Sequence, residues 1–244
     1  MKKLIQNFFF STNLNKKRNK LKNFFQIIEN NKYDIVFNIG AQTTNKNNTS
    51  DKVLANTFSN AHFILIEPLI TLIPDEKHNE IINREYKSFN VKFDLYDYCL
   101  SSKSKKVNFY IRGGKSSYYK SIVFKKQKRK YNKVVKTNTT TFDNNFFNFI
   151  YKNRNKKILL KIDTEGSELD ILKGAKKSLK YIDTIIAEVS NIDRFEGGAT
   201  MFEINQFLSK QGMYLANITK AIYNNNNQYI YFDCLFSKKD LKSN

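Results

Sequence analysis

The chain alternates short, continuously apolar runs with stretches in which apolar residues recur at helical spacing. The continuous runs predict buried parallel strands over residues 33–40, 62–68 and 91–100. The intervening pattern predicts helices over residues 50–59 and 69–88, the second of them interrupted at Pro74. An order of strand, helix and strand is typical of a parallel α/β sheet with right-handed crossovers.

This order is interrupted once and then resumes. Residues 106–112 and the segment around Val134 predict two strands flanking a loop that contains the basic run 124–130. Helices are then predicted over 141–151, 167–179 and 201–211, and strands over 157–163, 183–189, 213–218 and 228–236. The last two strands form a hairpin with its turn at 224–227, because asparagine tolerates left-handed backbone angles. The predicted fold is a mostly parallel α/β sheet whose closing hairpin places an antiparallel strand at the edge.

The pattern shows no internal repeat and no domain break, so residues 33–244 are expected to form a single domain. Residues 1–32 precede it as a basic helical extension, in which Leu21, Phe24, Phe25 and Ile28 recur at helical spacing.

Composition supports a folded protein. Of the 244 residues, 41% are hydrophobic and 14% aromatic, which excludes a disordered polycation. Cys99 and Cys234 are too few for a disulfide framework and are expected to be buried thiols in a reducing compartment. The apolar part of the N-terminal segment is broken by Gln6 and Asn7 and is too short for a signal peptide or a membrane span. We therefore expect a cytoplasmic protein.

The net charge of +20 admits two explanations. Lysine, asparagine, isoleucine, phenylalanine and tyrosine are abundant and tryptophan is absent, as expected when an A+T-rich genome biases codon use. The other explanation is a nucleic-acid site, in which the cations of the 125–130 run bind phosphates and Tyr118, Tyr119 and Tyr131 stack on bases. Compositional bias is the favoured explanation, because a run of charges is usually a solvated loop.

Polar residues gather where the predicted strands end. In parallel α/β sheets, ligands bind beyond the carboxyl ends of the strands. The residues at these positions are Asn38 with Gly40, Glu67, Asp97, Asp163 with Glu165, and Glu188. Five of them are acids, and a carboxylate at a buried strand end needs a hydroxyl, a cation or another hydrogen-bond donor.

Gly40 and Glu67 together suggest a nucleoside site. A glycine at a strand-to-helix turn allows a ligand to approach the backbone. An acid at the end of the next strand is placed to accept both hydroxyls of a ribose.

The segment 158–175 is the most specific in the chain. An apolar strand leads to Asp163, and Glu165 and Gly166 then turn into a helix that Ser167 is expected to cap. Glu168 and Asp170 fall in the first helical turn, where their negative charges interact favourably with the helix dipole. Asp163 and Glu165 precede the helix, so stabilisation of the helix start does not account for them.

The segment KIDTEGSELDILKGA closely resembles the signature of FkbM-family methyltransferases, which depend on S-adenosylmethionine. VFNIGA resembles the first-strand motif of that family, FILIEP the second, YCLSSKSKKVNFYI the third strand with its following hairpin, TTTFDN the segment before the fourth strand, and IIAEVS the fifth strand. The resemblance runs from about residue 33 to residue 236. It implies a Rossmann-like class I methyltransferase fold with a seven-stranded sheet ending in an antiparallel hairpin.

The resemblance also implies roles for the residues at the strand ends. Asn38, Gly40 and Ala41 would line the methionine portion of S-adenosyl-L-methionine and Glu67 its ribose. Asp97, Tyr98 and Cys99 would line the adenine region. Asp163, Glu165 and Glu188 would face a small-molecule or saccharide acceptor, whose hydroxyl receives the methyl group.

Methyl transfer requires alignment of the acceptor and removal of its proton. Asp163 could take that proton directly, or Asp163 and Glu165 could hold a divalent metal that lowers the pKa of the hydroxyl. Direct base action is preferred, since no third metal ligand is identifiable.

The chain departs from the family pattern at two places, Asn38 in place of an acid and residues 42–44 in place of a second glycine. An inactive, cofactor-binding member is therefore an alternative to an active enzyme. Specificity for the acceptor is expected to lie in segments 113–136 and 191–200. The pattern does not predict an oligomeric state.

Overall fold

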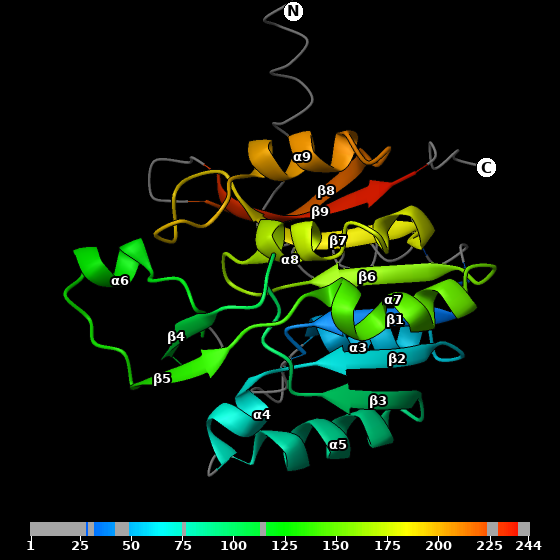
Figure 1. Ribbon diagram of the computed structural model, residues 1–244, viewed down its shortest axis with the longest axis horizontal. Helices are drawn as coiled ribbons and strands as arrows, with labels where there is room; N and C mark the ends of the chain where they lie inside the picture. The colour runs from blue at the N-terminus through cyan, green and yellow to red at the C-terminus, as the bar shows by residue number, and fades with distance from the viewer. Residues whose placement is uncertain are drawn as a thin grey trace, which may run out of the picture.

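The computed structural model describes residues 28, 32–41, 49–74, 77–112, 116–223 and 229–238. Seven strands form the central sheet in the order β3-β2-β1-β6-β7-β9-β8 (Figure 1). Their bounds are β1 Ile35–Ile39, β2 His62–Ile66, β3 Lys92–Tyr96, β6 Ile158–Ile162, β7 Thr184–Ser190, β8 Tyr214–Tyr223 and β9 Tyr229–Ser237. Strands β1, β2, β3, β6 and β7 are paired in parallel, and β9 is antiparallel to β7 and to β8.

The central strands are aligned at their carboxyl ends. Every residue of β1 and β6 is buried, as their apolar sequences require. Ile39 at the end of β1 pairs with Ile66 of β2 and with Ile162 of β6. The residues that follow these three strands therefore emerge at one edge of the sheet.

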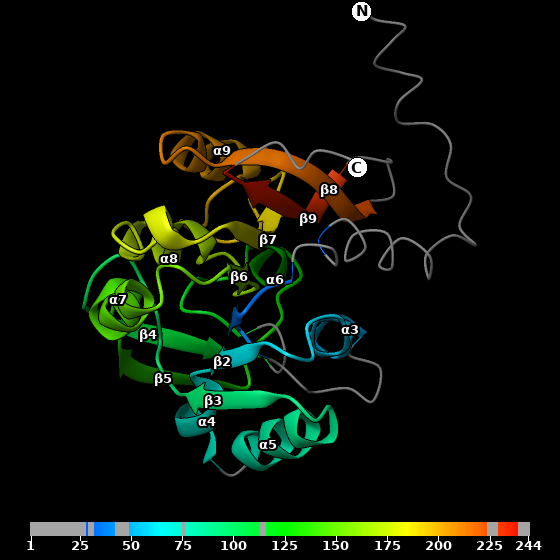
Figure 2. The same cartoon turned by 90° about the vertical axis from the view of Figure 1, so that its right-hand side faces the viewer.

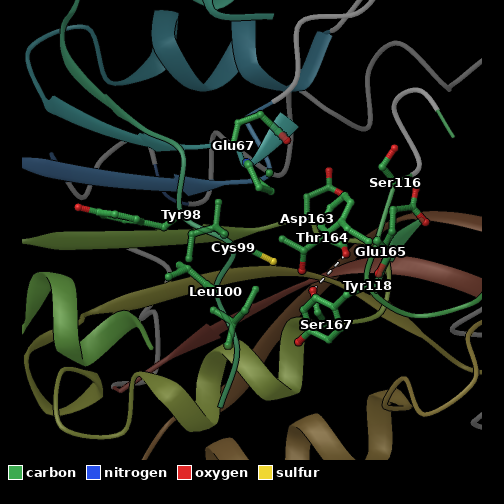
Figure 3. A pocket seen from close by; sticks show the side chains of 16 residues that line it. Glu67, Tyr98, Cys99, Leu100, Ser116, Tyr118, Asp163, Thr164, Glu165 and Ser167 are labelled. Atoms are coloured by element: carbon green, nitrogen blue, oxygen red, sulfur yellow. Dashed lines mark hydrogen bonds between the residues drawn. The ribbon is translucent and has the colours of Figure 1, made fainter. Parts of the chain in front are cut away.

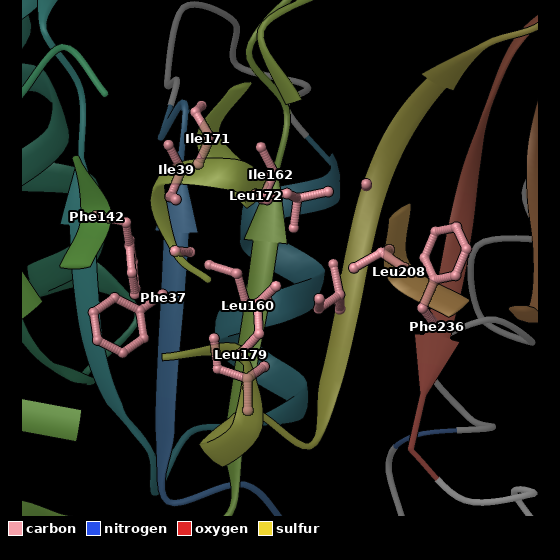
Figure 4. Close-up of a cluster of buried hydrophobic side chains, with 14 of the residues drawn as sticks. Phe37, Ile39, Phe142, Leu160, Ile162, Ile171, Leu172, Leu179, Leu208 and Phe236 are labelled. Atoms are coloured by element: carbon pink, nitrogen blue, oxygen red, sulfur yellow. The ribbon is translucent and has the colours of Figure 1, made fainter. Parts of the chain in front are cut away.

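Helices cover both faces of the sheet (Figure 2). Helices α7 (Phe142–Lys152), α8 (Glu168–Gly174) and α9 (Met201–Ser209) pack on one face, where they share a buried apolar cluster with the strands (Figure 4). Helices α3 (Thr49–Thr57) and α5 (His78–Ser88) pack on the other face, around Leu54 and Tyr86.

A second, two-stranded sheet lies between β3 and α7 in the sequence. It pairs β4 (Lys106–Ile111) with β5 (Lys133–Asn138) in antiparallel fashion, and helix α6 (Ile122–Lys126) lies between these strands in the chain. We call residues 101–140 the excursion. Its two ends lie side by side, because the Ser101 amide donates to the carbonyl of Thr140 at 2.8 Å.

The predicted fold class is confirmed, with four local differences. The stretch 69–88 forms two helices, α4 (Leu69–Leu72) and α5, because the residue before Pro74 is kept out of the helical region. Helix α6 occupies part of the predicted loop, and α8 ends at Gly174, before a short 3₁₀ helix at Leu179–Tyr181. Strand β9, which is antiparallel to both of its neighbours, lies inside the sheet. The edge is formed by β8, which runs in the same direction as the parallel strands.

Two predicted features lie mainly outside the described residues. Of the N-terminal extension, only Ile28 and Lys32 are described, and Ile28 is helical and buried against the α3 face of the sheet. The predicted hairpin turn 224–227 is not described. Among the described helices, none combines the length and the apolar character needed to cross a membrane.

Candidate active site

A pocket opens at the carboxyl edge of the sheet, between the ends of β1, β2 and β6 and the start of the excursion (Figure 3). Its empty volume is about 450 Å³, including the part open to solvent. Gly40, Glu67, Asp163 and Glu165 line it from the strand ends. Phe109 and residues 116–118 line it from the excursion, so residues distant in the sequence enclose one space.

Gly40 makes the first turn of the pocket possible. It has a φ of +81° and its amide donates to the carbonyl of Ile66 at 2.9 Å. A Cβ atom there would lie 2.0 Å from the carbonyl oxygen of Asp163. Only glycine allows the ends of β1 and β6 to approach this closely.

Glu67 is a buried carboxylate in the pocket wall, with 3% of the residue exposed. Its Oε1 accepts a hydrogen bond from the amide of Leu69 at 2.9 Å. Burial raises the pKa of Glu67 to about 8, although that hydrogen bond lowers it. A carboxylate in this environment gains from a ligand that donates hydroxyl hydrogens to it.

Asp163 is joined to a buried polar network beneath the pocket. Its side chain is 31% exposed, and one oxygen lies 3.6 Å from the ammonium of Lys161. Lys161 also lies 3.4 Å from Asp51 and donates to the amide oxygen of Asn38 at 3.2 Å. The amide nitrogen of Asn38 donates to the hydroxyl of Tyr86. Burial lowers the pKa of Lys161, but the nearby carboxylates of Asp51 and Asp163 raise it overall, so this lysine is a cation.

Glu165 belongs to a second buried group, an ion triad centred on Arg194. The guanidinium of Arg194 donates to Glu165 at 2.9 Å and to Glu188 at 2.7 Å. It also lies 3.9 Å from the centre of the Tyr231 ring. Burial raises the pKa of Glu188 to about 8, and the charges of Asp163 and Glu165 add to this effect while Arg194 opposes it.

The turn between β6 and α8 is held by Glu168. Its carboxylate accepts hydrogen bonds from the amides of Thr164 and Gly166 at 3.0–3.1 Å. The prediction that Ser167 caps α8 is wrong, because the Ser167 hydroxyl donates backwards to the carbonyl of Thr164 (Figure 3). Glu165 has a φ of +54°, a left-handed conformation that directs its carboxylate toward Arg194 and that is uncommon without glycine.

Asp170 connects this turn to the excursion. It accepts hydrogen bonds from the hydroxyls of Tyr118 at 3.2 Å and Tyr119 at 2.9 Å. Lys105 lies 3.7 Å from the same carboxylate. Asp170 therefore does more than stabilise the start of a helix, because it fixes the far wall of the pocket.

The residues predicted from the sequence divide into two groups. Six line the pocket: Gly40, Glu67, Tyr98, Cys99, Asp163 and Glu165. Four lie outside its wall: Asn38 in the buried network, Ala41 in the core on the α3 face, Asp97 exposed after β3, and Glu188 within β7 behind Arg194. Burial raises the pKa of the Cys99 thiol to about 12, so it is neutral.

Three charged residues of these networks were not predicted. Lys161 carries a usable signal, since a lysine inside an apolar strand has to be paired. Asp51 lies in a helix and Arg194 in a loop, both far from their partners along the chain. No local sequence pattern indicates that either residue belongs to a buried network. Among the described residues, no group of three His, Cys, Asp or Glu side chains could hold a metal ion.

The strand order, the single antiparallel strand and the pocket at the carboxyl edge define a Rossmann-like fold of the class I methyltransferase type. A family model for the methyltransferase FkbM domain matches residues 38–215, and the chain belongs to the FkbM methyltransferase family. It is therefore an S-adenosylmethionine-dependent methyltransferase by family. None of the curated proteins with which the sequence was compared matches it.

Proposed function

We propose that the protein transfers a methyl group from S-adenosylmethionine to a hydroxyl of a sugar or related small metabolite. S-adenosylmethionine supplies a methyl group on a sulfonium centre, so the carbon is already activated toward displacement. The enzyme then has to hold the acceptor in line and remove its hydroxyl proton.

The pocket residues fit the cofactor on its nucleoside side. Glu67 presents a buried carboxylate, which would accept hydrogen bonds from the ribose hydroxyls. Tyr98 and Cys99 would line the adenine region, with Asp97 at its exposed margin. Gly40 and Ala41 would carry the backbone past the methionine portion. Asn38 would act from below, through the network that holds Asp163.

Asp163 is the best candidate for the general base. It lines the pocket, its carboxylate is partly exposed, and Lys161 holds it in place from the buried side. The acceptor hydroxyl would give its proton to Asp163 as its oxygen forms the new bond to carbon. Glu165 is less suited to this task, because its carboxylate is already bonded to Arg194. Glu165 and Glu188 would instead shape the acceptor side as parts of the ion triad.

One observation carries the proposal. The same pocket is lined by Glu67, whose buried carboxylate can accept hydrogen bonds from a ribose, and by Asp163, whose carboxylate is partly exposed. The first experiment is a thermal-shift titration with S-adenosylmethionine and S-adenosylhomocysteine. Saturating ligand at about a hundred times Kd should stabilise the protein by about 2.7 kcal/mol. The absence of a shift with either compound at millimolar concentration would count against the proposal.

The second experiment tests the chemistry with Asp163→Asn and Asp94→Asn. Release of S-adenosylhomocysteine is measured with a panel of sugars, sugar phosphates and polyols. Asp163→Asn should lose activity by about a hundredfold or more while still binding the cofactor. Asp94→Asn, at a half-exposed carboxylate of β3 that pairs with His62 and lies outside the pocket wall, is the matched control. A wild-type protein that binds the cofactor but methylates nothing in a broad panel would support an inactive family member.

The cysteines support a cytoplasmic location. Cys99 and Cys234 are both buried free thiols, as expected in a reducing compartment.

A further inference from the structure

The positive charge of the protein is concentrated in the excursion. Residues 101–140 contain 13 Lys and Arg and no Asp or Glu, while the other 204 residues carry 29 Lys and Arg and all 22 acids. At the average frequency of acids in this chain, a segment of this length would hold three or four. Codon bias adds lysines, but it does not remove acids from one segment, so the local excess requires another explanation.

The excess charge lies on the outside of the excursion. Ten of its cations are exposed: Lys103, Lys106, Lys120, Lys125, Lys126, Lys128, Arg129, Lys130, Lys133 and Lys136. Lys125 forms an ion pair with Glu196 at 2.8 Å, and the partly buried Lys105 faces Asp170. Among the described residues, no acid lies within ion-pair distance of Lys126, Lys130 or Lys133. Such a surface attracts anions from solution.

The basic surface is held in a fixed position beside the pocket. Tyr118 and Tyr119 anchor the excursion to Asp170 of α8. The amide of Ile122, the first residue of α6, donates to the carbonyl of Arg194 at 2.8 Å. Figure 1 shows β4, β5 and α6 on the side toward which the parallel strands point, which is also the side of the pocket. The exposed cations of the excursion therefore lie on the same side of the sheet as the pocket.

The four tyrosines of the excursion make contacts within the fold. Tyr118 is buried, the Tyr119 hydroxyl is bonded to Asp170, and the Tyr131 hydroxyl accepts from the amide of Ser121. The Tyr131 ring also packs against Tyr110, with 4.9 Å between the ring centres. Single-stranded nucleic acid is bound by exposed aromatic rings that stack on bases, and these rings are not displayed in that way. Lysine ammonium groups bind the phosphates or carboxylates of a carbohydrate as compact point charges.

We infer that the methyl acceptor is an anionic saccharide, whose phosphate or carboxylate groups bind the exposed lysines of the excursion while its hydroxyl enters the pocket. This inference rests on the proposed function, since it identifies the chemical class of the acceptor. It requires several anionic groups or an extended chain, because the lysines are spread over α6 and β5 and each contributes little alone.

Binding of labelled oligosaccharides by fluorescence anisotropy tests the inference. The probes are an oligogalacturonate for carboxylates, a phosphorylated oligomannose for phosphates, unmodified oligomannose and an oligothymidylate. Wild-type protein should prefer one or both anionic saccharides to oligomannose, with an affinity that falls between about 50 and 300 mM salt. The stronger of the two anionic probes identifies the anion.

Two charge-matched variants locate the surface. Lys126→Gln/Lys130→Gln/Lys133→Gln removes three cations from the excursion, and it should weaken anionic binding about tenfold and reduce the salt slope by about two to three. The control removes three exposed cations at the opposite edge of the sheet, at Lys92, Lys152 and Lys156, and should change affinity by less than about twofold. Circular dichroism and the cofactor thermal shift verify that both variants are folded.

Three outcomes would overturn the inference: neither anionic saccharide binds more tightly than unmodified oligomannose, the two triple variants lose equal affinity, or oligothymidylate binds more tightly than both anionic saccharides. The saccharide measurements are made without cofactor, so they are independent of methyl transfer. A missing cofactor shift in the wild-type protein counts against the proposed function, whereas missing anion selectivity counts against the anionic acceptor.

Discussion

Replacing Arg194 by methionine should destabilise the protein strongly. The Arg194 side chain is 9% exposed and is the cation between Glu165 and Glu188, whose side chains are each 10% exposed. Methionine keeps much of the apolar contact with Phe195 and Tyr231 but removes the positive charge. The substitution therefore isolates the effect of leaving two carboxylates in a buried site without their cation.

The expected loss follows from the burial of all three groups. Removing one partner of a buried ion pair costs about 3–5 kcal/mol, because the remaining charge is uncompensated. In a domain of this size, 1 kcal/mol corresponds to about 2–4 °C in Tm, so the midpoint should fall by about 6–20 °C. The exposed Arg154, whose guanidinium lies over the Tyr151 ring, gives the control Arg154→Met, which should cost no more than about 0.5 kcal/mol.

The loss should depend on pH in a defined direction. The pKa of Glu188 is about 8 in the folded protein, above its ordinary value of 4.5. A carboxyl group with a raised folded-state pKa contributes most at low pH and loses stability as the pH rises through that interval. Without Arg194 the pKa rises further, so the difference between variant and wild type should be smaller at about pH 6 than at about pH 9.

Urea unfolding followed by circular dichroism at both pH values measures these differences. The neutral combination Arg194→Met/Glu165→Gln/Glu188→Gln should recover much of the lost stability, because no unpaired charge remains. A loss below about 1 kcal/mol at pH 9, or a loss that is equal at both pH values, would refute the reasoning.

Three further predictions concern the pocket and its turn. Glu67→Gln should weaken cofactor binding tenfold or more, and calorimetry should show that wild-type affinity rises with pH up to about 8 while the variant shows no such rise. Gly166→Ala should destabilise the protein more than Gly212→Ala in thermal unfolding, because both have positive φ but only the first would place Cβ 2.7 Å from the Phe195 ring; equal losses would show that φ alone matters. Asp163→Asn should lower kcat about a hundredfold or more, and unchanged kcat would exclude Asp163 from the role of general base.

The sequence predicted those parts of the fold that depend on local pattern. The runs containing Phe37, Phe63 and Leu160 each form a strand of the central sheet, and every residue of these strands is buried except the half-buried His62. The pocket was predictable for the same reason, because residues after aligned parallel strands share one edge. Gly40, Glu67 and Asp163 line one pocket there, and predicting this required no knowledge of which strands pair with one another.

The unpredicted parts depend on contacts between distant segments. Arg194 reaches Glu165 across 29 residues, and Asp51 reaches Lys161 from a helix on another part of the chain. Strand β7 continues for two residues beyond Glu188, so this side chain lies within the strand and belongs to the ion triad instead of the pocket wall. The sequence did not predict that β4 and β5 form a separate sheet. An alternation of half-buried and exposed residues indicates a strand, but it does not indicate which sheet the strand joins.

The closed ends of the excursion have a consequence for how enzymes of this architecture diversify. Backbone hydrogen bonds join Cys99 and Ser101 to Thr140, and the Thr139 hydroxyl donates to the carbonyl of Lys103, at the point where the chain leaves and re-enters the main domain. Because β4 and β5 pair with each other and not with the seven-stranded sheet, we expect the segment between these residues to change in length or sequence without altering the order of the seven strands. If the excursion binds the acceptor as we infer, transplanting it between relatives is expected to carry a substrate preference with it, provided that the recipient has an acid at the position of Asp170 to accept hydrogen bonds from its tyrosines.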